Sequence, residues 1–83
     1  MITITGKSNC PMCVNLENAV KKTGVEYQKV DLESDPDYMI KVMEGGNRTP
    51  ACIFVGKERY VVSEKTPAKV PQIIQWLKEQ DVL

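Results

Sequence analysis

"NCPMCVNLENAVKKTG", residues 9–24, places two cysteines three positions apart at the start of a segment with helical periodicity. Apolar side chains recur in this segment at spacings of three and four, as on one face of an α-helix, and these are Cys13, Leu16 and Val20. Pro11 favours the first helical position, and Gly24 favours the position that ends a helix. The pattern predicts a helix from Pro11 to about Thr23, with Cys10 as its N-cap.

Strand and helix signals alternate along the rest of the chain. β-branched and aromatic residues predict strands at residues 1–5, 26–32, 51–55 and 60–62. A second helix is predicted after Asp35, with Pro36 at its first position and "GG" at 45–46 as its stop. A third helix is predicted over residues 70–77 and should begin close to Pro71. The apolar positions expected to face the core are Met39, Val42 and Met43 in the second helix and Val70, Ile73, Ile74 and Leu77 in the third.

The order βαβαββα predicts an α/β fold. A first βαβ unit gives two parallel strands joined by a right-handed crossover. The turn "GKER" at 56–59 should pair the last two strands antiparallel. We therefore expect a mixed four-stranded sheet with helices on both faces. The length of 83 residues suits a single domain over residues 1–83.

Composition excludes several function classes. The chain has 11 basic and 11 acidic residues, and this balance argues against a nucleic-acid partner, which needs clustered positive charge. The apolar runs are far shorter than the roughly 20 residues that span a bilayer, so no membrane association is expected. The N-terminal residues lack the apolar stretch of a signal peptide, which makes a reducing cytoplasm the expected location. In such a compartment a close pair of cysteines is more often catalytic or metal-binding than structural.

The two cysteines differ in their predicted surroundings. Free backbone N–H groups and the positive end of the helix dipole favour an anion at Cys10, and Lys7 adds a positive charge nearby. Cys13, one turn into the helix on its apolar face, should stay protonated until it is needed. The resulting chemistry is thiol–disulfide exchange, in which Cys10 attacks a disulfide and Cys13 then releases the product by closing a Cys10–Cys13 disulfide. Cys52 lies in the apolar run "ACIFV" and is expected to be an inert buried thiol.

Metal binding is the alternative function. One C-x-x-C without histidines or a second cysteine pair cannot complete a four-ligand zinc site within one chain, so no metal residues are predicted. An iron–sulfur or zinc carrier that bridges two chains through Cys10 stays open at this point. Visible absorbance or stoichiometric metal in protein purified without oxygen would favour the carrier.

Several motifs resemble the glutaredoxin family of the thioredoxin superfamily, and the likeness covers essentially the whole chain. They are the C-P-x-C at the start of the first helix, Lys7 three residues before it, "YQKVDLESDP" at 27–36 and "GGNRTP" at 45–50. The last of these is most similar to the branch that includes NrdH-redoxins and mycoredoxins. The resemblance implies a thioredoxin-like fold and a dithiol oxidoreductase, with Cys10 as nucleophile and Cys13 as resolving thiol. It also implies a cis Thr49–Pro50 bond that leaves the Thr49 backbone free to pair with substrate.

The resemblance further implies where substrates and electron donors bind. The predicted substrate-binding residues are Lys7, Pro11, Met12, Arg48, Thr49, Pro50, Ser63 and Glu64. Glutathione-dependent members carry Gly-Gly and Asp after the last strand, whereas this chain has "VVSEKTP" at 61–67. We therefore expect glutathione to be a poor reductant, and a thioredoxin-reductase-type enzyme or another small thiol to be better. The expected partners are disulfide-containing proteins, the chain is expected to act as a monomer, and no tightly bound cofactor is expected besides the redox-active disulfide.

Overall fold

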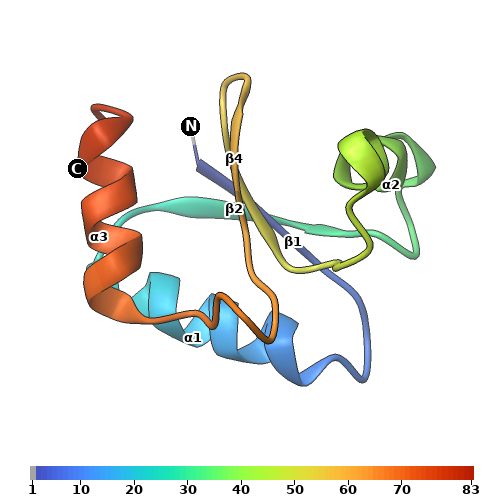
Figure 1. The fold of residues 1–83 in the computed structure, drawn as a ribbon, viewed down its shortest axis with the longest axis horizontal. Coiled ribbons are helices and arrows are strands. Elements are labelled where there is room, and N and C mark those ends of the chain that lie inside the picture. The colour runs from blue at the N-terminus through green and yellow to red at the C-terminus, as the bar shows by residue number, and fades with distance from the viewer. Residues whose placement is uncertain (1) are drawn as a thin grey trace.

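Residues 2–83, which the computed structural model describes, form a mixed four-stranded sheet and three α-helices (Figure 1). Met1, the first residue of the first predicted strand, lies outside the described residues. The elements are β1 (Ile2–Gly6), α1 (Pro11–Thr23), β2 (Tyr27–Asp31), α2 (Pro36–Met43), a short 3-10 turn η1 (Glu44–Gly46), β3 (Cys52–Val55), β4 (Glu58–Val61) and α3 (Val70–Glu79). The predicted order of strands and helices is confirmed.

The strands lie in the order β2-β1-β3-β4. β1 runs parallel to β2, from the pair Ile2–Tyr27 to the pair Gly6–Asp31. β3 is antiparallel to β1 and also to β4, and the second of these pairings was predicted from the short β3–β4 connection. Because β1 and β2 are parallel, both strands end at the same edge of the sheet, and the cysteine pair follows β1 at that edge.

Helices cover both faces of the sheet, as predicted. α1 and α3 lie on one side and α2 on the other (Figure 1). Successive residues of β3 point to opposite faces, so Ile53 joins the cluster that packs on α1 and α3 while Cys52 joins the cluster beneath α2. All five residues of β1 are buried, as expected for a central strand covered on both sides.

Local signals set the ends of α1. Cys10 caps its first turn, Pro11 occupies its first position, and Gly24 ends it with a left-handed φ of 79°. The side chains predicted to face the core are buried, and these are Cys13, Leu16 and Val20. The C-x-x-C pair therefore lies between the end of β1 and a helix whose ends are capped and whose apolar face is buried.

The structure departs from the sequence expectations around α2 and β4. The α2 helix ends at Met43, where the Arg59 guanidinium donates to the carbonyls of Lys41, Val42 and Glu44 at 3.0, 3.2 and 2.6 Å. Met43 is 57% exposed, so its predicted place in the core was wrong; it lies at the last position of the helix. β4 begins at Glu58, within the predicted turn 56–59.

Candidate functional site

The cysteine pair occupies the N-terminus of α1, as predicted. Cys10 has extended backbone angles, φ −116° and ψ 103°, and its Sγ accepts the backbone N–H of Cys13 at 3.2 Å. A sulfur therefore takes the place of the side-chain oxygen that usually caps a helix. Cys10, Cys13 and Cys52 are all free thiols.

Both cysteines of the pair are buried, with 8% of Cys10 and 6% of Cys13 exposed. The two cysteines therefore differ little in exposure, although a difference was expected, and they are distinguished by their hydrogen bonds. Burial, together with a hydrogen bond between the two side chains, raises the pKa of the Cys13 thiol to about 12, although a backbone hydrogen bond with Lys7 acts in the opposite direction. Cys13 is thus held as a neutral thiol, whereas the sulfur of Cys10 accepts the helix N–H.

Close packing against β1 fixes Cys13. A Cβ built on Gly6 would lie 3.1 Å from the Cys13 Cβ and 3.4 Å from its Sγ, so a larger residue at this point of the strand would require Cys13 to shift by a few tenths of an ångström. This contact was not apparent from the sequence, where Gly6 served only as a strand end.

The Thr49–Pro50 segment differs from what the family resemblance implied. The peptide bond is trans, and the Thr49 backbone is not free. Asn47 accepts from the Thr49 N–H at 3.2 Å through Oδ1 and donates to the Thr49 carbonyl at 3.1 Å through Nδ2. The same amide donates to the Val42 carbonyl at 2.7 Å, which ties the loop to the end of α2. The Asn47 side chain thus forms hydrogen bonds with the N–H and the carbonyl of Thr49, the groups that were expected to pair with substrate.

Thr5 holds the other end of this loop. Its hydroxyl donates to the Pro50 carbonyl at 2.8 Å and accepts the Cys52 N–H at 3.2 Å. Cys52 itself is fully buried, as predicted, and burial raises the pKa of its thiol. Asn47 and Thr5 thus hold the loop that contains Thr49 and Pro50, and the sequence analysis missed both. The polar character of Thr5 inside the buried strand β1 was a signal that could have found it.

A groove of about 320 Å³ brings four predicted site residues together. Lys7 and Arg48 supply its positive charges, and Thr49 and Pro50 form part of its wall. The apolar part of the lining comes from α2, through Met39, Val42 and Met43. Lys7 lies three residues before Cys10 in the chain, although neither Cys10 nor Cys13 is among the residues that line the groove.

The other predicted residues lie around the start of α1 or outside this groove. Pro11 is exposed, while Met12 is half-buried and packs on the core cluster that contains both cysteines, so it is less exposed than expected. Ser63 and Glu64 do not line the groove. They belong to a tight turn in which the Ser63 N–H and carbonyl pair with the backbone of Thr66 at 3.0 and 3.1 Å.

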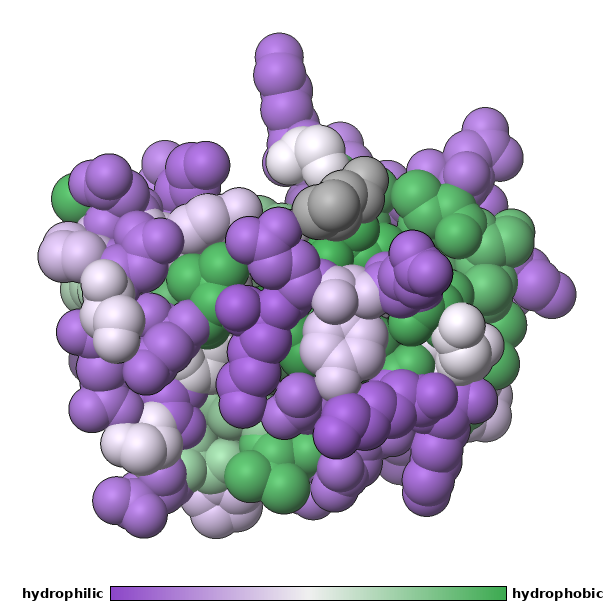
Figure 2. Space-filling view, turned by 180° about the vertical axis from the view of Figure 1, so that it is seen from behind, coloured by the Kyte–Doolittle hydropathy of each residue, from purple (hydrophilic) through white to green (hydrophobic). Residues whose placement is uncertain are grey.

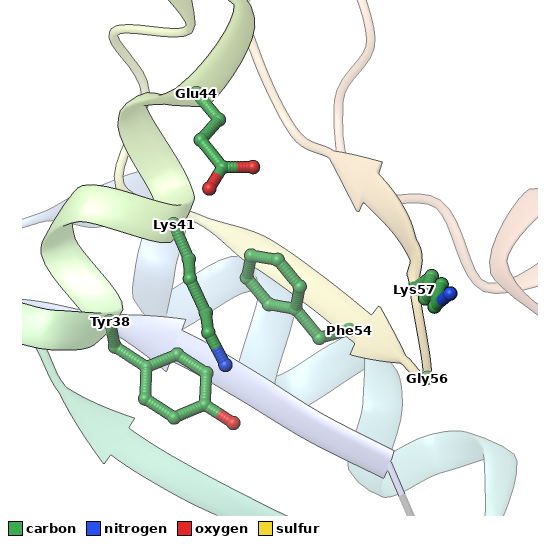
Figure 3. A pocket seen from close by; sticks show the side chains of 6 residues that line it. All are labelled: Tyr38, Lys41, Glu44, Phe54, Gly56 and Lys57. Carbon is green, nitrogen blue, oxygen red and sulfur yellow. The ribbon is translucent and has the colours of Figure 1, made fainter.

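Two further hollows lie away from the cysteines. One, of about 340 Å³, is lined by Ile2, Val25, Glu26 and Val82. The view from behind shows hydrophobic residues in several groups among hydrophilic ones (Figure 2). The other, of about 280 Å³, lies between α2 and the β3–β4 turn, where the Lys41 side chain crosses the Tyr38 ring beside Phe54 (Figure 3). Both are at the end of β1 opposite to Gly6, because Ile2 pairs with Val55 in the sheet. Neither has Cys10 or Cys13 in its lining.

The described residues, 2–83, contain no group of three or more His, Cys, Asp or Glu side chains placed to hold a metal ion. Within the same range, no helix is long and apolar enough to cross a bilayer.

Comparison with known proteins places this geometry in a family context. The family model described as Glutaredoxin matches residues 2–61. Two curated relatives, the glutaredoxin-like protein NrdH of Lactococcus lactis subsp. cremoris (strain MG1363) and of subsp. lactis (strain IL1403), are each 22% identical over 73 residues, covering 88% of this chain and 99% of theirs. A solved structure of the glutaredoxin-like NrdH-redoxin from Escherichia coli, described as having a thioredoxin-like activity profile, aligns with a TM-score of 0.70 and 16% identity over 89% of this chain and 91% of that one.

These likenesses confirm the thioredoxin-like fold and the glutaredoxin-like branch expected from the motifs. The matched residues include both β1 and the C-P-M-C segment, and they extend through β4. The chain belongs to the glutaredoxin family, whose members carry out thiol–disulfide redox chemistry.

Proposed function

We propose that this chain reduces disulfides through a dithiol formed by Cys10 and Cys13. The observation that carries the proposal is the hydrogen bond of 3.2 Å from the Cys13 N–H to the Cys10 Sγ at the N-terminus of α1. A negative sulfur at this position is stabilised by that N–H and by the helix dipole. Cys10 is therefore the attacking group, and Cys13, whose pKa burial raises, is the resolving thiol.

The proposed reaction has two exchange steps. In the first, the Cys10 thiolate attacks one sulfur of a substrate disulfide, a Cys10–substrate bond forms, and the other substrate sulfur leaves as a thiolate that takes up a proton. In the second, Cys13 loses its proton and attacks the Cys10 sulfur, which releases the remaining substrate sulfur as a thiol. The substrate disulfide gains two electrons, and the Cys10–Cys13 dithiol loses two. The Cys10–Cys13 disulfide is the only redox group that this sequence of steps requires.

The substrate proposed for the groove is an extended segment of a disulfide-containing protein. Lys7 and Arg48 lie where a carboxylate near the substrate cysteine could pair with them, and a guanidinium can hold a carboxylate through two hydrogen bonds. Met39 and Met43 offer flexible apolar contacts that suit varied side chains. Because the Thr49 N–H and carbonyl are already hydrogen-bonded to Asn47, we expect the substrate segment to be recognised by side chains rather than by strand addition.

The electron donor proposed is a thioredoxin-reductase-type enzyme or a small thiol other than glutathione. The Ser63 N–H and carbonyl are paired with Thr66 and are not available to the γ-glutamyl group of glutathione. Glu64 is exposed beside them and adds a negative charge that disfavours a carboxylate. A dithiol carrier of this kind would work in a reducing compartment such as the cytoplasm.

The test is the reduction of a disulfide-containing protein by the pre-reduced chain, with the product examined by mass spectrometry. The expected product is an internal Cys10–Cys13 disulfide formed in step with substrate reduction. Cys52→Ser is the matched control and should be as active as the unsubstituted protein, because Cys52 is buried beneath α2. Absence of substrate reduction, or oxidation that depends on Cys52, would contradict the proposal.

A further inference from the structure

Three exposed residues, Lys7, Ser8 and Asn9, connect β1 to the cysteine pair. Asn9 has a left-handed φ of 57°, a conformation that asparagine adopts more readily than most residues other than glycine. The direction in which the chain enters α1, and so the place of the Cys10 sulfur, depends on this segment.

A single carboxylate from another part of the chain holds the segment. Glu33 Oε1 accepts the Ser8 backbone N–H at 2.7 Å and also accepts the Ser8 hydroxyl. These two hydrogen bonds, with a smaller contribution from the Lys7 charge, hold the pKa of the Glu33 carboxyl below its usual range. Hydrogen bonds to an ionised acceptor are the stronger kind.

Glu33 is itself held in place. It lies in a turn that follows β2, where its N–H donates to Asp31 Oδ1 at 2.9 Å and the Ser34 N–H donates to the Asp31 carbonyl at 3.0 Å. The Leu32 N–H donates to the Gly6 carbonyl at 2.9 Å, which extends the parallel pairing of β1 and β2 to the start of the loop. Glu33 thus links two adjacent strand ends through a short and well-ordered turn.

We propose that Glu33 is a positioning residue for Cys10: by binding Ser8 it keeps the Lys7–Asn9 segment in the conformation that brings the Cys10 Sγ onto the N–H of Cys13. The inference rests on the proposed role of Cys10 in disulfide exchange. Glu33 forms its hydrogen bonds with Ser8 and with neither sulfur, so in this proposal it acts through the loop.

Three variants separate this role from a general effect of charge or stability. Glu33→Ala removes both hydrogen bonds, while Glu33→Gln removes the charge and keeps an oxygen that accepts from Ser8. Glu26→Ala removes an exposed carboxylate at the opposite end of β2 and serves as the control. All three are made in a Cys13→Ser, Cys52→Ser background, so that Cys10 is the remaining thiol.

The measurements are the rate of Cys10 reaction with a small disulfide, the hydrogen exchange of the Ser8 and Cys10 amides, and the unfolding temperature. Glu33→Ala should lower the rate about fivefold, the factor that corresponds to one net hydrogen bond, and should speed amide exchange at Ser8. Glu33→Gln, whose neutral oxygen can still accept from Ser8 but more weakly, should restore part of the rate, and Glu26→Ala should leave it unchanged. If Glu33→Ala also lowers the unfolding temperature, Ser8→Ala, which keeps the carboxylate and one hydrogen bond, should give an intermediate rate.

An unchanged or faster rate in Glu33→Ala would overturn the inference, and so would an equal loss in Glu33→Gln, which would assign the effect to charge. Either result with an active unsubstituted protein leaves the proposed function intact. Failure of the unsubstituted protein to reduce any disulfide would instead contradict the proposed function itself.

Discussion

Gly6→Ala adds one methyl group at the point where β1 packs against Cys13. Its new Cβ would lie 3.1 Å from the Cys13 Cβ and 3.4 Å from the Cys13 Sγ, so Cys13 must shift by a few tenths of an ångström. Overpacking of this kind costs about 1–3 kcal/mol. The loss of a glycine from a strand returns roughly 0.5–1 kcal/mol. The expected net effect is a decrease of about 1 kcal/mol in the free energy of unfolding, which for a domain of this size lowers the unfolding temperature by about 4–8 °C.

The same displacement should slow the resolving step but not the first attack, because Cys13 moves relative to Cys10 while the loop before Cys10 stays anchored through Ser8. The assay combines thermal unfolding, followed by circular dichroism, with the lifetime of the mixed disulfide after rapid mixing with a small disulfide. A double-mutant cycle with Cys13→Gly, which removes both contacting atoms, should cancel the cost of Gly6→Ala. An unfolding temperature equal to or above that of the unsubstituted protein, with an unchanged mixed-disulfide lifetime, would refute the packing argument.

Three further predictions address the pKa of Cys13, the Asn47 contacts and the electron donor. In Cys10→Ser the Cys13 thiol titrates near about 8.5 in the unfolded chain, whereas in the folded chain burial keeps its pKa raised. The stability that Cys13 contributes is therefore fully present below about pH 8.5 and is lost as pH rises through the folded pKa. Unfolding experiments at a series of pH values in this range should show the decline in the free energy of unfolding. Thiolate absorbance from Cys13 already present at neutral pH would contradict the raised pKa. Asn47→Ala should lower the free energy of unfolding by roughly 1–2 kcal/mol and raise the KM for a protein disulfide, because the Thr49 backbone and the Val42 carbonyl lose their partner. The control is Asn18→Ala, at an exposed position of α1. If the two substitutions had equally small effects, the role assigned to Asn47 would be refuted. A side-by-side rate comparison should show slower turnover with glutathione and its reductase than with a thioredoxin reductase, and equal rates would remove the argument based on Ser63.

Local sequence signals were sufficient to predict the order of the elements. Helix α1 begins and ends where Pro11 and Gly24 indicated, because capping residues act on their own neighbours along the chain. The C-x-x-C pair could be placed at its N-terminus for the same reason. The apolar run at 51–55 predicted a strand covered on both faces, and the two clusters that meet on β3 account for it.

Features that depend on contacts between distant residues were not predictable in this way. The end of α2 is fixed by Arg59, which lies 15 or more positions from the carbonyls it binds, and the periodicity of α2 alone placed Met43 in the core. The hydrogen bond between Ser8 and Glu33 joins exposed residues 25 positions apart, and no local pattern pairs the two. The conformation of Thr49–Pro50 was inferred from a family resemblance, and the Asn47 side chain holds its backbone in a different arrangement.

The most direct test of the dithiol mechanism is to compare Cys10→Ser with Cys13→Ser after each has reacted with the same disulfide substrate. The products are separated without reductant and weighed intact by mass spectrometry. Cys13→Ser should accumulate one covalent adduct through Cys10, because attack remains possible while resolution is lost, and Cys10→Ser should accumulate none. Adducts that build up on Cys10→Ser and not on Cys13→Ser would reverse the roles of the two cysteines and contradict the account of the α1 N-terminus as the site of the nucleophile.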